Sequence, residues 1–204
     1  MRLLGQHPSD LDPARPWVEL GQETLSETRL FKHLLLHRRS PHGPREHGFT
    51  RLSCPEWVNV IAFRALDLGG DLLAVEQFRH GTDRASLEIV GGVCDPGEAP
   101  EASARRELRE ETGHGAAQWI SLGSCAPNPA VQDNRCHFFL ALDCVPEGPL
   151  DLDPSEEIRV WGVPWPEWKA RMADGRVDHA LVLAAFARLF LWEGWPGFSR
   201  RLGD

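Results

Sequence analysis

The 204-residue sequence is poor in cationic side chains, and this shortage limits the partners it can bind. It contains 22 Lys and Arg against 30 Asp and Glu, which gives a net charge of −8. A broad phosphate-binding surface needs an excess of positive charge, so nucleic acid is not an expected partner. An anionic ligand must instead be met locally, by a few cations or by a metal ion.

The cysteines are few, and their spacing shows no pairing. There are five of them, an odd number, and none belongs to a C-x-x-C pair. A disulfide framework and a zinc ribbon are therefore both unexpected, and we expect reduced, mostly buried thiols. Tyrosine is absent while tryptophan occurs eight times, and we assign Trp161, Trp165 and Trp168 to packing rather than to base stacking.

No segment has the length and hydrophobicity of a membrane span. The longest apolar stretch, residues 180–192, is interrupted by Arg188 and is shorter than the roughly 20 residues that a span requires. Residues 1–10 lack the apolar centre of a secretory signal. We therefore expect no membrane partner and a cytoplasmic location.

The composition is that of a globular protein, with 42% hydrophobic and 25% charged residues. Residues 41–48 are rich in Pro and Gly and separate two β-prone runs at 29–37 and 49–53. We interpret residues 1–55 as a small strand-rich dimerisation unit and residues 56–204 as the main domain. The strands of the first unit, residues 17–53, form a segment of fewer than forty residues, and units below about 40 residues rarely bury a core without a staple or a partner.

The main domain is expected to combine a mixed sheet with helices on its faces, an α/β or α+β sandwich. Pro100 suits the first position of a helix and Gly113 its C-cap. Two helices are expected to close the chain, and Gly175 and Gly194 are expected to stop them. The patterns predict strands near 57–64, 72–78, 86–90, 117–122, 135–142 and 159–163, and helices at 100–112, 165–173 and 178–193.

One of these predicted helices carries a cluster of carboxylates. Glu107, Glu110 and Glu111 are spaced i, i+3 and i+4, so their side chains project together. Like charges this close repel each other, and oxygen-only ligands suit a hard divalent cation such as Mg²⁺ or Mn²⁺. Arg106 can reach back to Glu98 or across to Glu110. The alternative for an acidic helix is a solvated face with i,i+4 ion pairs.

The glycine-rich turn before the helix weakens that alternative. Seven specified residues fall at fixed spacing, and a random match is on the order of one in a hundred million per start position. Residues 92–114 resemble the Nudix box, G-x5-E-x7-R-E-U-x-E-E-x-G-U. His114 stands at an aliphatic position of that box and is expected to loosen the packing after the helix. The resemblance implies a Nudix α/β/α sandwich that hydrolyses a nucleoside diphosphate linked to another moiety.

A weaker similarity extends over residues 15–192 to one branch of the Nudix hydrolases. This is the branch of ADP-ribose pyrophosphatases and nucleoside-diphosphate-sugar hydrolases. Residues 76–79 (EQFR) and 87–92 (LEIVGG) resemble its Q-aromatic-R and L-E-x-P-A-G strands, with Val90 in place of the Pro. Pro129 follows the box where that branch keeps a proline.

The resemblance also implies roles for individual residues. In the acidic loop at 153–158, Glu156 best matches a metal ligand or catalytic base, and Glu157 and the box glutamates are the alternatives for the base. Arg79 is expected either to bind a diphosphate or ribose oxygen or to form a surface salt bridge. Glu88 is expected either to contact the ribose or a metal-bound water or to pair with an arginine. Catalytic roles fall on Glu107, Glu111, Glu156 and Arg106, substrate contacts on Arg79, Glu88 and Pro129, and metal ligation on Glu107, Glu110, Glu111, Glu156 and a carbonyl of Gly91 or Gly92.

The leading functional hypothesis is metal-dependent hydrolysis of the pyrophosphate bond of ADP-ribose or a related nucleoside diphosphate sugar, giving a nucleoside monophosphate and a sugar phosphate. One alternative is a Nudix hydrolase of dinucleoside polyphosphates, coenzyme A or nucleoside triphosphates. Another is a nucleotide-sensing module without catalysis, against which the intact box argues. The resemblance further implies a homodimer in which the strands of residues 17–53 pack on the neighbouring subunit.

Overall fold

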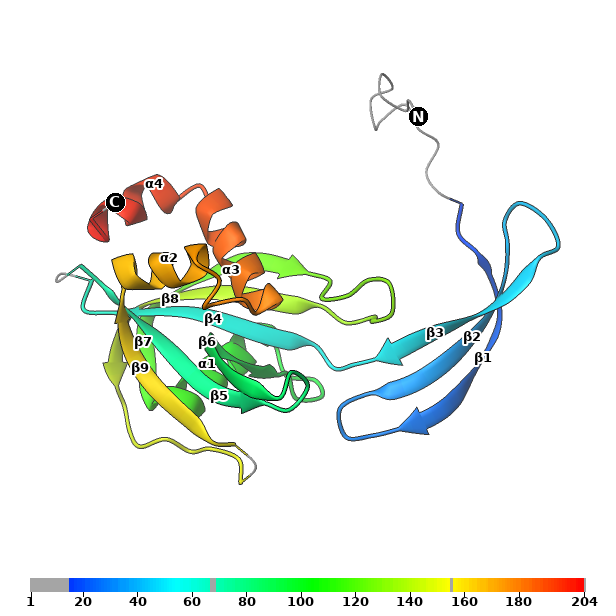
Figure 1. Ribbon diagram of the computed structural model, residues 1–204, viewed down its shortest axis with the longest axis horizontal. Coiled ribbons are helices and arrows are strands. Elements are labelled where there is room, and N and C mark those ends of the chain that lie inside the picture. Colours follow the sequence, from blue (N-terminus) through cyan, green and yellow to red (C-terminus); the bar gives the residue numbers. More distant parts are fainter. Residues whose placement is uncertain (1–14, 67–68, 155, 204) are drawn as a thin grey trace, which may run out of the picture. The chain divides into compact units, whose positions relative to one another are not determined.

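The computed structural model describes residues 15–66, 69–154 and 156–203 (Figure 1). The chain divides into two compact units, Met1–Cys54 and Pro55–Asp204. Each unit has a sheet of its own, with three strands in the first and six in the second. None of the helices in the described ranges is long and apolar enough to cross a membrane.

The N-terminal unit is an antiparallel sheet with little core. Its strands lie in the order β1-β2-β3. Of its described apolar side chains, only Leu34 and Leu36 on β2 are buried. Many others are exposed, namely Val18, Leu20, Leu25, Leu30 and Phe49. The strands are β1 (Val18–Glu27), β2 (Lys32–Arg39) and β3 (Glu46–Ser53).

The strand boundaries in this unit differ from those that the sequence predicts. β2 begins at Lys32, later than expected, because the Thr28 hydroxyl accepts backbone N–H bonds in a turn just before it. β3 begins at Glu46, inside the Pro- and Gly-rich segment. Gly48 can join the strand because it has no side chain, and Leu35 Cδ1 lies 3.0 Å from where a Cβ would stand. β1 lies outside both predicted β-prone runs.

The second unit is built on a mixed sheet, as the sequence predicts. The strand order is β7-β8-β4-β6-β5-β9, and β4 also pairs with β5. Only the pairing of β4 with β8 is parallel among the described strands. The strands are β4 (Trp57–Arg64), β5 (Asp71–Arg79), β6 (Arg84–Val93), β7 (His114–Cys125), β8 (Cys136–Pro146) and β9 (Ile158–Pro164).

Alternation along β4 divides the core between the two faces of this sheet. Val60 and Ala62 pack on one side with α1 (Pro100–Thr112). Ile61 and Phe63 pack on the other side with the helices that follow the sheet. These helices are α2 (Trp165–Ala173), α3 (Ala180–Leu191) and α4 (Trp195–Arg201). Helices therefore cover both faces, which confirms the expected sandwich (Figure 1).

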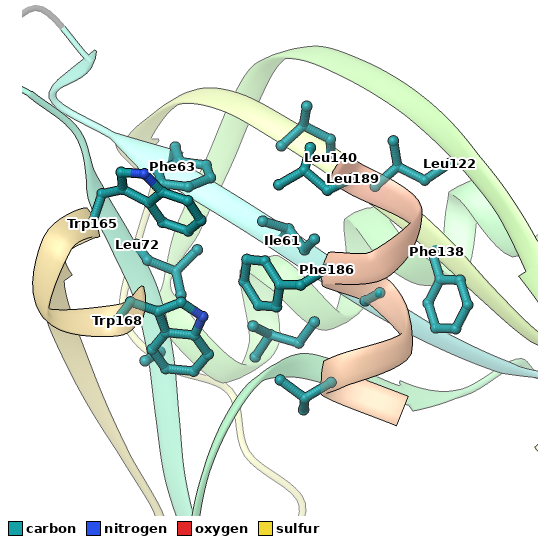
Figure 2. Packing of buried hydrophobic residues seen from close by; sticks show 14 of the residues in the cluster. Ile61, Phe63, Leu72, Leu122, Phe138, Leu140, Trp165, Trp168, Phe186 and Leu189 are labelled. Atoms are coloured by element: carbon teal, nitrogen blue, oxygen red, sulfur yellow. The ribbon is translucent and has the colours of Figure 1, made fainter. Parts of the chain in front are cut away.

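Aromatic rings form the centre of the face that carries α2 and α3 (Figure 2). Trp165 and Trp168 are fully buried, and each packs on Phe186, with ring centroids 6.0 and 5.6 Å apart. The Trp168 ring comes from α2, whose bounds agree with the prediction. Assigning these two tryptophans to packing is therefore confirmed, whereas Trp161 on β9 is about half exposed.

The prediction of two closing helices was incomplete. α3 ends at Leu191, and a further helix, α4, begins after Gly194. Pro196 lies in the first turn of α4, where a missing N–H costs nothing. A proline just after Gly194 is therefore a sequence signal for the start of this helix. Phe198 of α4 is buried in the same core cluster as α3.

Two leucines on α3 allow a matched test of this packing. Leu189 is fully buried, whereas Leu191 is 81% exposed. We expect Leu189→Ala to lower the free energy of unfolding by about 2–5 kcal/mol, because it leaves a cavity in the core. Leu191→Ala should change it by less than about 0.5 kcal/mol. Urea titrations followed by tryptophan fluorescence measure both, and equal losses would contradict the assigned packing.

Candidate active site

Helix α1 brings the carboxylate cluster to the sheet. It begins with Pro100 in its first turn and ends at Gly113, a left-handed C-cap whose N–H donates to the Arg109 carbonyl. Ala104 and Leu108 are fully buried against the sheet. The neighbouring face of α1 therefore carries its glutamates close to the end of β6.

Two glycines at the end of β6 let the strand approach these glutamates. The Gly91 N–H donates to Glu111 Oε2 at 3.2 Å. A Cβ on Gly92 would stand 2.3 Å from Glu107 Oε1, so any other residue there would displace the Glu107 carboxylate. Glu111 is 2% exposed, and the Glu107 side chain is 12% exposed. Both carboxylates are thus enclosed between helix and strand.

Arg106 is the cation of the cluster, and it reaches both of the partners suggested by the sequence. Its guanidinium donates to Glu98 Oε2 at 3.1 Å and to Glu110 Oε2 at 2.9 Å. It also donates to Glu107 Oε1 at 2.8 Å and to the Val93 carbonyl at 3.0 Å. One arginine therefore joins the loop after β6 to the acidic face of α1.

The environment shifts the pKa values of these carboxyl groups in opposite directions. Hydrogen bonds from Arg106 and from the Ser103 hydroxyl lower the pKa of Glu98 to about 2. Burial raises the pKa of Glu107 to about 7, although Arg106 opposes it. Burial and the charge of Glu107 raise the pKa of Glu111 to about 8, against the Gly91 N–H bond. The two buried carboxylates thus lack full compensation for their charge.

The donor chemistry of this site fits a hard divalent cation. Glu107 and Glu111 offer carboxylate oxygens in an enclosed place, and the clustered side chains are all glutamates, with no His or Cys among them. A cation there would favour their ionised forms. The described part of the chain holds no group of three His, Cys, Asp or Glu side chains already gathered as a metal cage. Glu107 would have to exchange its contact with Arg106 for a contact with the ion.

Arg79 and Glu88 form one ion pair beside the box. Arg79 Nε and a terminal nitrogen bind the two Glu88 oxygens at 2.9 and 2.7 Å. Glu88 is only 1% exposed, and although burial opposes it, Arg79 keeps the Glu88 pKa below its ordinary value. Glu88 mainly, and also Glu111 and Glu156, raise the pKa of Arg79. Glu88 is thus an arginine partner here, and the half-exposed Arg79 faces the acidic cluster.

Glu156 belongs to the same charged neighbourhood. Its charge helps to raise the pKa values of Glu107 and Glu111. The side chain is exposed, and its Oε2 accepts the Asp153 N–H at 3.2 Å. The charge of Glu156 therefore acts on the box glutamates, while its described hydrogen bond is to the backbone of its own loop.

The loop that carries Glu156 is attached to the end of α1 through backbone atoms. The Asp151 N–H donates to the Glu110 carbonyl at 2.9 Å. The N–H groups of Glu147 and Gly148 donate to the Gly113 carbonyl at 2.8 and 3.2 Å. Helix α1 thus supplies the box glutamates and also the anchor of the acidic loop.

Pro129 lies on a separate loop, between β7 and β8, and it is exposed. The end of this loop is held at the start of β4, where Asn134 Nδ2 donates to the Pro55 carbonyl at 2.8 Å. The Glu56 carbonyl next to it accepts the N–H of Cys94, just after β6. The loop that carries Pro129 therefore lies at the same end of the sheet as the box. The hydrogen bonds described for this loop do not involve the box carboxylates.

Sequence reasoning did not single out two polar residues that the structure places near the box, Ser103 and Asn59. Ser103 is buried, and its hydroxyl donates to Glu98 at 2.5 Å; its position three residues before Arg106 on α1 was an available signal. Asn59 is a buried amide on β4 next to Gly91. No motif pointed to it, because it lies within an apolar strand.

The raised pKa of Glu111 yields a test that needs no substrate. Because the folded-state pKa of about 8 lies above the ordinary 4.5, ionisation of Glu111 destabilises the fold increasingly as pH rises from 4.5 through 8. Glu111→Gln removes that charge and can still accept the Gly91 N–H. In chelator at pH 8.5 we expect its Tm to exceed that of the wild type by roughly 5 °C.

The gain should disappear at pH 4.5, where wild-type Glu111 is protonated. Glu110→Gln is the matched control, since its side chain is 29% exposed and pairs with Arg106. That variant should show no gain in Tm at either pH. A pH-independent difference for Glu111→Gln would contradict the burial argument.

Comparisons with known proteins agree with this site. The sequence matches the Nudix domain family over residues 55–186. It is 36% identical over 105 residues to an ADP-ribose pyrophosphatase of Bacillus subtilis, covering 51% of this chain and 57% of that relative. It is 28% identical over 167 residues to an ADP-ribose pyrophosphatase of Mycobacterium tuberculosis, covering 81% and 79%.

Two further comparisons cover more of the relatives' length than the Bacillus match does. The ADP compounds hydrolase NudE of Escherichia coli is 30% identical over 147 residues, covering 72% of this chain and 76% of that protein. The fold is shared with a crystal structure of an ADP compounds hydrolase, with a TM-score of 0.76 and 22% identity over 92% of this chain and 100% of that one. With its box helix and sandwich in place, this chain belongs to the Nudix family of hydrolases, in the branch that resembles the ADP-ribose pyrophosphatases.

Proposed function

We propose that this protein hydrolyses the pyrophosphate bond of ADP-ribose or a related nucleoside diphosphate sugar, with Mg²⁺ or Mn²⁺ as cofactor. The observation that carries the proposal is the enclosure of Glu107 and Glu111 between α1 and the glycines Gly91 and Gly92 at the end of β6. The names of the relatives from Bacillus subtilis and Mycobacterium tuberculosis support the substrate class. The odd number of cysteines and the lack of a C-x-x-C pair support a reducing compartment such as the cytoplasm.

Hydrolysis of a pyrophosphate requires neutralised phosphate oxygens and a deprotonated water. Nudix hydrolases generally use a divalent metal, which neutralises the phosphate oxygens and eases deprotonation of water. In our proposal Glu107, Glu110, Glu111 and the carbonyl of Gly91 or Gly92 hold this ion. Arg106 keeps the glutamates in place through the contacts described above.

Two residues outside the box complete the proposed reaction. Arg79 is half exposed and faces the acidic cluster, so it can bind a diphosphate oxygen while Glu88 fixes its guanidinium. Glu156 accepts a proton from the attacking water, whose oxygen forms the new bond to phosphorus as the bridging P–O bond breaks. Pro129 borders the distal sugar. The products are a nucleoside monophosphate and a sugar phosphate.

The experiment that tests this function combines a substrate panel with metal removal. Purified protein is assayed on ADP-ribose, GDP-mannose, UDP-glucose and dinucleoside polyphosphates, with analysis of the phosphorylated products. We expect ADP-ribose or a nucleoside diphosphate sugar to give the highest kcat/KM. EDTA should abolish turnover, and Glu111→Gln should reduce kcat by about a hundredfold or more with the fold intact. Full activity in chelator would overturn the metal assignment.

The acidic loop offers a comparison between two adjacent glutamates. Both Glu156 and Glu157 are exposed, and the charge of Glu156, unlike that of Glu157, is among the leading causes of the pKa shifts of Glu107 and Glu111. We expect Glu156→Gln to lower kcat by at least about tenfold and Glu157→Gln to leave it near wild type. The reverse result would assign the base to Glu157, and two active variants would return it to the box.

We also propose a two-fold homodimer assembled through the N-terminal unit. The support is the small core of this unit, where exposed Val18, Leu20, Leu25, Leu30 and Phe49 outnumber the buried leucines. Exposed apolar side chains on a sheet with free edges favour association with another chain. The nucleoside pocket would then include residues of this unit.

Light scattering at micromolar concentration should give the mass of a dimer. Deleting residues 1–55 should lower both solubility and substrate affinity, because the proposed interface is lost while every box residue remains. A monomeric full-length protein together with a fully active truncated protein would refute the proposal.

A further inference from the structure

A single amide lies within the apolar face of β4. Asn59 is 7% exposed, and the next residues on the same face, Ile61 and Phe63, are fully buried in the core cluster. A leucine of similar size would fit an apolar neighbourhood without the cost of desolvating an amide. The presence of Asn59 therefore calls for a function that its polar atoms serve.

One polar atom of Asn59 is held by a thiol. The Cys136 Sγ–H donates to Asn59 Oδ1 at 3.1 Å, and both groups are buried. Burial raises the pKa of the Cys136 thiol to about 12, so the thiol keeps the proton that it donates. This bond fixes which side of the amide is the carbonyl and which is the nitrogen.

The amide nitrogen lies against Gly91. Asn59 and Gly91 are directly opposite each other in the pairing of β4 with β6. Asn59 Nδ2 stands 2.5 Å from the place that a Gly91 Cβ would occupy, so the amide fills the space of the missing side chain. The L-E-x-P-A-G pattern has Ala at this position, and Gly91 departs from it here, where the asparagine takes the room.

The same glycine binds the catalytic helix through its N–H, which donates to Glu111 Oε2 at 3.2 Å. The Asn59 amide therefore lies between the Cys136 thiol, which donates to it, and Gly91, whose N–H binds the Glu111 carboxylate. We propose that Asn59 is a positioning residue of the active site, whose amide, oriented by Cys136, holds Gly91 where its N–H binds Glu111 and its carbonyl can face the metal. This inference rests on the proposed function of the box.

The first test replaces the amide by an apolar group of similar size, Asn59→Leu. We expect kcat to fall by about tenfold or more with KM for the substrate within about twofold of wild type. We also expect Mn²⁺ to bind several times more weakly, measured by electron paramagnetic resonance of free Mn²⁺ without substrate. A purely structural amide would alter stability without changing the binding of Mn²⁺ to the folded protein.

Two controls separate positioning from stability. Val182→Ala removes volume from the same core cluster on α3, away from Gly91, and should lower Tm without changing kcat or Mn²⁺ binding. Cys136→Ser keeps a donor for Asn59 Oδ1, whereas Cys136→Ala removes it. We expect the serine variant to retain near wild-type kcat and the alanine variant to share the defect of Asn59→Leu.

Each outcome bears on one proposal. Wild-type kcat and Mn²⁺ binding in Asn59→Leu would overturn the positioning role, while inactivity of Glu111→Gln would leave the proposed function standing. An active Glu111→Gln would instead overturn the function of the box. If Asn59→Leu fails to fold, the Cys136 variants decide, because equal activity of serine and alanine at that position would refute the inference.

Discussion

The hydrogen bond from the Gly91 N–H to Glu111 joins the central sheet to the box helix, and the surrounding structure depends on this contact. It requires a strand that ends in glycines and a helix whose apolar stripe lies flat on the sheet. It also requires that a carboxylate be buried, which raises the pKa of Glu111 to about 8. The fold thus buries a carboxyl group whose ionised form is unfavourable until a cation lies beside it.

Arg106 distributes the remaining acidic charge around that contact. Its bonds to Glu98, Glu107 and Glu110 keep one acidic group strongly ionised and compensate two others only in part. This arrangement reduces the repulsion between the glutamates while leaving some of their oxygen atoms available to bind a cation. Arg106, which stabilises the fold, and a bound cation would therefore compete for the same carboxylate oxygens of Glu107 and Glu110.

Much of the second unit could be predicted from the sequence, because its signals are local. The bounds of α1 follow from Pro100 and Gly113, and the strand at β4 follows from a continuous apolar run. The N-terminal strand boundaries were less predictable, since β1 has no clear alternation of polar and apolar residues. Asn59 could not be found from sequence, because its role depends on Gly91 and Cys136, which only the folded sheet brings beside it.

The loop that carries Glu156 hangs from the end of α1 by backbone groups alone, with Asp151 bound to the Glu110 carbonyl and Glu147 and Gly148 to the Gly113 carbonyl. Main-chain atoms are the same for every residue except proline. The side chains between these backbone hydrogen bonds and β9 can therefore change over evolutionary time while the loop stays attached to α1. Selection can alter the chemistry presented to a ligand at this edge while the reacting helix stays untouched.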